Sequence, residues 1–300
     1  MTLNFGMDRW SSVLGMNRRN ALVDMENPPE AVRLVNNKHE TKVTLAKAGV
    51  PVPTTIALLR GRGDLSRFGW DALPESWALK PNLGRRGAGI VLATGRDREG
   101  WRTASGHPLS RADVSDHLRR VLDGEFSLEG AERDLALFEP LISTHEDLAR
   151  LVPHGLPDVR VICHGDEPVL AMMRLPTLAS DGRANLHQGA IGAAVDLRSG
   201  RLTAAVHGRS RIDHHPDTGE RLLCAEIPHW QTIVEAASRC AAATGLGYLG
   251  ADIVVDEARG PLVLEVNARP GLEIQNVTRT GLRTLVAASP TANVAVTLAG

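Results

Sequence analysis

Three side chains with oxygen donors lie within an apolar hairpin near the end of the chain. The stretch LGADIVVDEARGPLVLEVNARPGLE, residues 249–273, is typical of two buried strands joined by a short turn. Alternate residues of a strand share a face, so Glu265 and Asn267 point the same way and Asp252 can lie opposite them. Buried carboxylates need compensating cations, and Mg²⁺ prefers carboxylate, water and phosphate oxygens. The pattern therefore indicates a metal site. A structural alternative pairs the carboxylates with arginines of the same region: Arg259, Arg269 or Arg279.

A lysine and a glycine-rich loop form a second candidate. In ALKPNLGRRGAGI, residues 78–90, Lys80 ends an apolar strand and three glycines follow. Glycines let backbone N–H groups approach an anion, and a lysine supplies a point charge for phosphate. The loop lacks the GK[ST] of a Walker A motif, and a strand rather than a helix is expected to follow, unlike the Rossmann fingerprint. By itself the pattern favours a phosphate loop no more than a glycine-rich hairpin with a solvated lysine.

The composition narrows the class of protein. The 300 residues include 34 basic and 35 acidic side chains, and 3% are aromatic. Without a basic block or many stacking platforms, neither a nucleic-acid nor a membrane-surface role is expected. We expect no membrane span and no secretory signal, because no run of about 18 apolar residues occurs and the first residues lack an apolar core. The three cysteines lie far apart, which favours a reducing compartment and a cytoplasmic protein.

Apolar periodicity and capping residues predict a mixed α/β chain. We expect helices over 37–49, 110–124 and 227–247, a strand over 135–142, and strand pairs over 76–93, 158–176 and 249–273. Asn37 and Ser110 are the expected N-caps. Residues 1–36 are expected to be irregular, because the ENPPE sequence breaks any helix near Pro28. His214 and His215 precede a proline in a polar turn, where we expect solvated side chains.

Taken in order, these motifs resemble the ATP-grasp superfamily and, within it, alpha-L-glutamate ligase-like proteins related to the ribosomal-protein glutamate ligase. Further motifs carry the resemblance, which extends over roughly residues 14–285: LGMNRRN (14–20), NNKHETK (36–42) and RANLHQGA (183–190). It implies an α+β, ATP-grasp fold in which two lobes clasp ATP, preceded by a truncated N-terminal segment. The expected parts are an N-terminal segment and helix (1–49), a small lobe with the glycine loop (50–138) and a large lobe with the metal site (139–300).

The resemblance also assigns roles to individual residues. Lys38 and Lys80 would contact the nucleotide phosphates, and a loop that closes over them would contain Gly84, Gly87 and Gly89. The Glu139 carbonyl and the Leu141 N–H would hold adenine, and Asp158 would hold the ribose. Three polar residues would lie near the transferred phosphate: Arg174, Arg183 and Asn185. Three ligands would hold Mg²⁺ or Mn²⁺: Asp252, Glu265 and Asn267.

The implied activity is ATP-dependent ligation of a carboxylate to an amine through an acyl phosphate, with an amino acid such as glutamate as one substrate. Two alternatives remain open: a ligase for another small carboxylate in a biosynthetic pathway, and a non-catalytic nucleotide-binding regulatory module. The partners would be small-molecule or peptide substrates, and a homo-oligomer could replace contacts normally made by a fuller N-terminal domain. The sequence identifies neither substrate, and it does not distinguish a single ligation from polymerisation.

Overall fold

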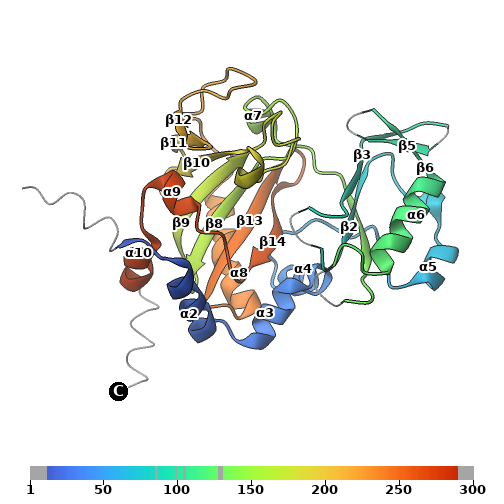
Figure 1. Ribbon diagram of the computed structural model, residues 1–300, viewed down its shortest axis with the longest axis horizontal. Coiled ribbons are helices and arrows are strands. Elements are labelled where there is room, and N and C mark those ends of the chain that lie inside the picture. Colours follow the sequence, from blue (N-terminus) through green and yellow to red (C-terminus); the bar gives the residue numbers. More distant parts are fainter. Residues whose placement is uncertain (1–11, 85–86, 99, 104–105, 128–130, 290–300) are drawn as a thin grey trace, which may run out of the picture. The chain divides into compact units, whose positions relative to one another are not determined.

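The computed structural model describes residues 12–84, 87–98, 100–103, 106–127 and 131–289 (Figure 1). The chain forms two compact units. The first unit contains the residues up to Val35, Val43–Val52 and the residues from Ser143 on; the second contains Asn36–Lys42 and Pro53–Ile142. These bounds differ from the expected 50–138 and 139–300, because strand β7 (Ala136–Pro140) pairs on both sides with strands of the second unit. The described residues before position 50 are divided between the two units.

The first unit is built on one antiparallel sheet. Its strand order is β12-β11-β10-β9-β8-β13-β14. The bounds are Asp158–His164 (β8), Glu167–Leu175 (β9), Ile191–Val195 (β10), Leu202–His207 (β11), Ser210–Ile212 (β12), Tyr248–Asp256 (β13) and Gly260–Asn267 (β14). The hairpins expected over 158–176 and 249–273 are therefore confirmed as β8–β9 and β13–β14.

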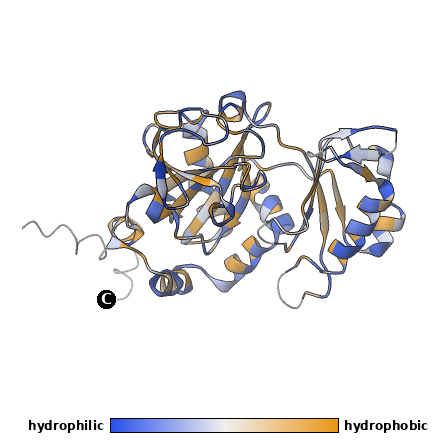
Figure 2. Cartoon of the chain, turned by 45° about the horizontal axis from the view of Figure 1, so that its top comes forward, coloured by the Kyte–Doolittle hydropathy of each residue, from blue (hydrophilic) through white to orange (hydrophobic). Residues whose placement is uncertain are grey.

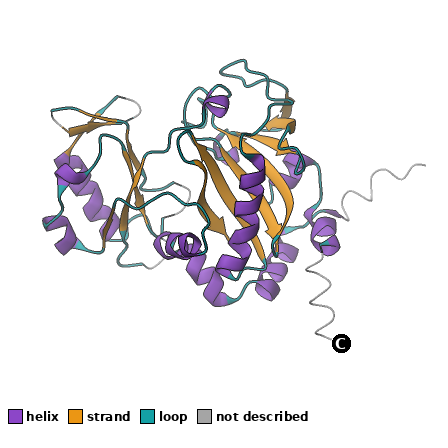
Figure 3. Ribbon diagram, turned by 180° about the vertical axis from the view of Figure 1, so that it is seen from behind, coloured by secondary structure: helices purple, strands orange, loops and turns teal. Residues whose placement is uncertain are grey.

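The two faces of this sheet have different surroundings. Helix α8 (Trp230–Thr244) covers one face, where it packs on inward-pointing residues such as Val161, Met173 and Ile253 (Figure 3). Gly245 ends α8 with φ +74°, as a C-terminal glycine is expected to do. The other face carries a smaller apolar cluster that includes Ile162 and Met172. The described part of this unit also contains three short helices: α7 (Glu146–Ala149), α9 (Ile274–Thr278) and α10 (Leu282–Ala288).

The expectation that residues 1–36 are irregular is wrong for the described residues. They form helices α2 (Met16–Glu26) and α3 (Pro29–Asn36), and the chain breaks between them as expected. A proline is tolerated in the first turn of a helix, where its missing N–H has no partner to lose. Asn27 lies in the break and ties it to the sheet. Its side chain donates to the carbonyls of Tyr248 and Ala268 (2.8 and 3.1 Å) and accepts from the Tyr248 N–H (2.8 Å).

The second unit contains two small antiparallel sheets. The larger has the order β1-β7-β2-β3 and the smaller the order β4-β5-β6. The remaining strand bounds are Ala57–Leu59 (β1), Trp77–Pro81 (β2), Val91–Ala93 (β3), Gly95–Arg96 (β4), Gly100–Arg102 (β5) and Pro108–Ser110 (β6). In both units the strands are rich in apolar residues, whereas the helices mix apolar with hydrophilic residues (Figure 2).

Two helices of the second unit begin where the sequence predicts them: α6 (Arg111–Leu122) and α4 (Lys38–Lys47), whose first half belongs to this unit. The short helix α5 (Arg62–Ser66) and the 3₁₀ turn η1 (Trp70–Ala72) were not predicted. Ser110 and Asp113 form a reciprocal capping box on α6, and the Asn37 side chain accepts from the Glu40 N–H. In the described part of the chain, no helix has the length and apolar character needed to cross a membrane.

Candidate functional site

The sheet face opposite α8 ends in a group of charged side chains on neighbouring strands. Arg160 on β8 donates two hydrogen bonds to Asp252 on β13 (Nε–Oδ1 2.7 Å, Nη2–Oδ2 2.6 Å). Arg174 on β9 donates two to Asp158 on β8 (2.5 and 2.6 Å) and also contacts the Asp252 carboxylate (2.9 Å). Two guanidinium groups therefore share two buried carboxylates, with Arg174 joining both.

Glu265 and Asn267 extend this group on strand β14. Glu265 lies directly opposite Asp252 in the register, and Asn267 donates to an Asp252 oxygen (Nδ2–Oδ2, 3.2 Å). A bulge at Leu264 makes this possible. It lets Val263 and Val266 both pack on the α8 side while Glu265 turns to the other face. We call the six residues the carboxylate–arginine cluster: Asp158, Arg160, Arg174, Asp252, Glu265 and Asn267.

Glu265 differs from the other carboxylates of the cluster. Its side chain is half-buried and has no hydrogen-bond or ion-pair partner among the described residues, whereas Asp158 and Asp252 are both paired. Three carboxylates face two guanidiniums, which leaves one negative charge in excess. This excess charge is what a cation-binding site requires. The first residues singled out in the sequence are thus brought together on one face, as expected.

The electrostatics separate the two aspartates. Burial by itself raises the pKa of Asp252, but the Arg160 and Arg174 guanidiniums outweigh it and hold this pKa at about 2. Burial raises the pKa of Asp158 to about 6, although Arg174 opposes the change, and the nearby Asp252 charge adds to it. Asp252 therefore stays ionised at any working pH, whereas Asp158 takes up a proton in mildly acidic solution.

The Asp158 side chain gives a pH prediction. Because its folded pKa lies above its value in the unfolded chain, the folded state binds more protons between about pH 4 and pH 6, and stability falls as pH rises through this window. We expect the Asp158→Asn variant to lack this pH-dependent part of the unfolding free energy. The difference in unfolding free energy between wild type and variant should fall by at most about 3 kcal/mol across the window. Urea unfolding at several pH values measures it, and a difference that rises with pH would contradict the assignment.

The donor set fits a divalent cation. Glu265 is unpaired, and the Oδ1 of Asn267 is a further neutral oxygen donor. The Asp252 oxygens already accept four contacts, but ionised carboxylates have further lone pairs to share with a metal. Among the described residues, no group of three or more His, Cys, Asp or Glu side chains is placed to hold a metal ion. Ligand oxygens, such as those of a phosphate, would have to complete the coordination, as is usual for Mg²⁺.

The second unit carries a group of lysines around one buried glutamate. Lys42 and Lys80 each bind one Glu139 oxygen at 2.7 Å, and Lys42 also donates to the Thr55 hydroxyl (3.1 Å). Lys38, one turn earlier on α4 than Lys42, donates to the Gly84 carbonyl. We call these four residues the lysine cluster: Lys38, Lys42, Lys80 and Glu139. Three cations face one carboxylate, so this cluster has the charge excess that suits a phosphate.

Burial and charge shift two groups of the lysine cluster. Burial lowers the pKa of Lys42, with Glu139 opposing the change. Burial acts to raise the pKa of Glu139, but Lys80 and Lys42 outweigh it and lower this pKa. The Glu139 side chain is therefore an ionised counter-ion for two lysines. The resemblance assigns Glu139 only a backbone role. That role remains a prediction, as does the one for Leu141, which directly follows β7.

The glycine loop joins β2 to β3 as expected, but its glycines differ. Gly87 has φ +77° and open space where a Cβ would lie. Gly89 has φ +72°, and a Cβ there would approach the Phe126 ring to 2.5 Å, so its glycine is needed for packing. Gly84 forms an isolated bridge with Ser127. Residues 85 and 86 of the loop lie outside the described part of the chain.

The remaining predicted site residues lie in different surroundings. Asp158 lies in the carboxylate–arginine cluster, with both oxygens bound by Arg174, and its contact with ribose remains a prediction. Arg183 is exposed and has Asp181 as its ion-pair partner (3.7 Å), and Asn185 accepts from the His187 N–H. Among the described contacts, neither Arg183 nor Asn185 touches the carboxylate–arginine cluster.

Two residues were missed by the reading of the sequence. Arg160 follows Asp158 by two positions in a strand, and this spacing places both on one face. Lys42 follows Lys38 by four positions in a helix, which also places both on one side. Each spacing is visible in the sequence, but its role depends on distant partners: Asp252 on β13 for Arg160 and Glu139 on β7 for Lys42.

Comparisons with known proteins show to which family the chain belongs and which fold it shares. Residues 17–289 match the model of a family described as sugar-transfer associated ATP-grasp. The chain belongs to this ATP-grasp family. The D-alanine–D-alanine ligase of Bacillus anthracis, solved in complex with ATP, shares the fold with a TM-score of 0.53 and 14% identity, over 92% of this chain and 74% of that one. The predicted α+β, ATP-grasp fold is thereby confirmed.

Curated relatives support the narrower resemblance. A probable alpha-L-glutamate ligase of Xanthomonas oryzae pv. oryzae is 26% identical over 251 residues, which cover 82% of this chain and 61% of the relative. One of the same name from Sodalis glossinidius is 33% identical over 119 residues, which cover 40% of this chain and 29% of the relative. The chain thus spans about three fifths of the length of the Xanthomonas relative, and the resemblance to alpha-L-glutamate ligase-like proteins is confirmed.

Proposed function

We propose that this ATP-grasp protein is an ATP-dependent carboxylate–amine ligase that forms an amide bond through an acyl phosphate. The observation that carries the proposal is the unpaired Glu265 carboxylate, opposite Asp252 and beside Asn267, on a sheet face that also presents two arginines. Family membership makes ATP the expected nucleotide. The lysine cluster supplies the second charge pattern that such a reaction needs, an excess of cations for phosphates.

The proposed reaction proceeds in two steps. An oxygen of the substrate carboxylate attacks the γ-phosphorus of ATP, the bond to the bridging oxygen breaks, and ADP leaves. An amine nitrogen then attacks the acyl carbon, phosphate leaves, and the amine loses a proton. The protein has little covalent chemistry to perform, so positioning and charge stabilisation account for most of the catalysis.

Each cluster has a task in this reaction. Lys38 and Lys80 bind the nucleotide phosphates. Asp252, Glu265 and Asn267 would hold Mg²⁺ or Mn²⁺, and the bound ion would offset charge on the triphosphate. Arg174 is already oriented by Asp158, and its guanidinium stabilises the phosphoryl group and the tetrahedral oxyanion as negative charge develops.

The substrates are proposed from the relatives. Curated relatives are named probable alpha-L-glutamate ligases, so glutamate is the first candidate for one substrate. Another small carboxylate remains the alternative. A non-catalytic nucleotide-binding module is disfavoured, because such a module is expected to have lost its metal-binding carboxylates or its phosphate lysine, and both are present here.

Release of ADP by the purified protein tests the proposal. Amino acids and candidate amines are screened in pairs with ATP and Mg²⁺, and the products are identified by mass spectrometry. We expect ADP formation to depend on both an amino acid and an amine, and the product mass to equal their sum less one water. ADP release that no amine increases would contradict the ligase and favour the regulatory module.

A further inference from the structure

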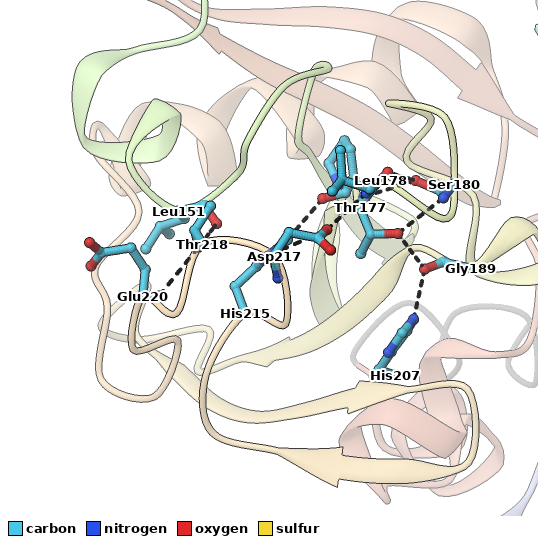
Figure 4. Close-up of polar contacts among 11 residues, drawn as sticks. Leu151, Thr177, Leu178, Ser180, Gly189, His207, His215, Asp217, Thr218 and Glu220 are labelled. Carbon is cyan, nitrogen blue, oxygen red and sulfur yellow. Dashed lines mark hydrogen bonds and ion pairs between the residues drawn. The ribbon is translucent and has the colours of Figure 1, made fainter.

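A network of buried polar contacts holds the segment that carries Arg183 and Asn185. This segment, residues 176–190, connects β9 to β10 and contains the 3₁₀ turn η2 (Leu186–Gln188). Figure 4 shows its two ends bound by side chains from a second loop, residues 213–222, and from β11. Between these ends, Gly182 packs closely against Gly155, and the next residue, Arg183, is exposed.

His215 is the centre of the network. The expectation of a solvated side chain is wrong for this residue, because His215 is 1% exposed. Its Nε2 lies 2.9 Å from the Pro176 carbonyl, and its Nδ1 accepts from the Asp217 N–H at 3.2 Å. A carbonyl can only accept, so Nε2 carries the proton and both ring nitrogens are used.

Three more side chains complete the attachment. The Asp217 carboxylate accepts from the Leu178 N–H (2.8 Å), so the 213–222 loop binds the segment at two successive points. At the far end, the Thr177 hydroxyl and the His207 Nε2 both donate to the Gly189 carbonyl (2.9 and 3.0 Å). Thr177 thereby links the beginning of the segment to its end.

The 213–222 loop is itself anchored. The Thr218 hydroxyl donates to the Leu151 carbonyl at 3.3 Å, and the Leu222 N–H donates to the Asp213 carbonyl at 2.8 Å. Because the 213–222 loop is held in place, its contacts with Pro176 and Leu178 can hold segment 176–190 in place.

The segment also reaches toward the carboxylate–arginine cluster. The Leu186 side chain packs over Gly192, where an added Cβ would lie 2.9 Å from its Cδ2. Gly192 is the cross-strand neighbour of Arg174. The turn that carries Asn185 therefore lies next to the strand position of Arg174, although the polar side chains themselves do not touch.

We propose that His215, with Asp217, is a positioning residue for the ligase reaction: it holds segment 176–190, which carries Arg183 and Asn185, next to the strand position of Arg174. This inference rests on the proposed function for its catalytic part. Among the described contacts, His215 touches no residue of the carboxylate–arginine cluster. Its effect is exerted through the segment, and misplacement of a catalytic group by about 1 Å can cost about 100-fold in rate.

Three variants test the proposal. His215→Leu removes both hydrogen bonds. His215→Gln keeps them, because a glutamine amide can donate to the Pro176 carbonyl and accept from the Asp217 N–H. His214→Leu is the matched control, since His214 is the exposed neighbour. Hydrogen exchange followed by mass spectrometry measures the segment, and steady-state kinetics measures ligation.

For His215→Leu we expect exchange in residues 176–190 to rise about tenfold, with peptides of β13 and β14 unchanged. The kcat should fall by about 10–100-fold with little change in the KM for ATP. His215→Gln and His214→Leu should resemble wild type in both measurements.

Several results would overturn the proposal. Unchanged exchange in residues 176–190 would show that His215 does not hold the segment. Raised exchange with an unchanged kcat would show that ligation does not depend on the segment's position. Raised exchange throughout the first unit would reduce His215 to a general stabilising role. A wild type without turnover on any substrate pair would refute the proposed function and the catalytic part of this inference, while the exchange comparison would still decide whether His215 holds the segment.

Discussion

Replacement of Glu265 by glutamine is expected to lower ADP formation at least about 100-fold while leaving the fold intact. Glu265 has no internal partner among the described residues, so the change breaks no ion pair, whereas it removes the excess negative charge of the carboxylate–arginine cluster. The thermal midpoint should stay within about 2 °C of wild type. ADP release over a range of Mg²⁺ concentrations measures the activity, and scanning calorimetry measures the stability.

A matched control keeps the Glu265 result specific. Glu235→Gln makes the same chemical change at an exposed position of α8, in the same unit. It should leave turnover and stability unchanged. If Glu265→Gln retained full turnover at limiting Mg²⁺, the carboxylate would have no place in metal binding. A large fall in thermal midpoint would instead mean that Glu265 has a structural role.

Lys80→Met is expected to abolish turnover for a different reason. The Lys80 ammonium is one of two that neutralise the buried Glu139 carboxylate, and in the proposed reaction it also contacts a phosphate. Its removal should therefore reduce activity and also destabilise the second unit by about 1.5–3 kcal/mol, since a charged hydrogen bond is lost. Both effects would follow from one substitution, so a second variant is needed to separate them.

The double variant Lys80→Met/Glu139→Gln makes this separation. Without the Glu139 charge, the missing ammonium no longer leaves a carboxylate under-compensated, and much of the lost stability should return. Turnover should not return, because the phosphate contact is still absent. Lys47→Met, at an exposed position of α4, is the control and should behave as wild type. Recovery of turnover in the double variant would contradict the proposed contact between Lys80 and a phosphate.

The parts of the site that depend on one strand or one helix were predictable from the sequence. Alternation along β14 places Glu265 and Asn267 together, and the short turn after β13 brings Asp252 opposite them. Capping residues likewise fixed the starts of α4 and α6, because a cap acts within its own first turn. These features need no knowledge of distant residues.

The parts that were missed depend on partners far away in the chain. The pairing of Arg160 with Asp252 joins residues 92 positions apart, and that of Lys42 with Glu139 joins residues 97 apart. The polar neighbours of His215 in the sequence predict a solvated side chain, yet this side chain is buried and lies against the Pro176 carbonyl. A single sequence shows each group but not its partner.

The contacts of Asn27 limit how the chain can be shortened. A version that begins after this residue would leave the Tyr248 N–H and the carbonyls of Tyr248 and Ala268 without their present partner, at the ends of the two strands that carry Asp252 and Glu265. Unmet backbone groups of this kind loosen a sheet from its margin inward. Helix α2 and the residue that follows it thus form an integral border of the β13–β14 hairpin.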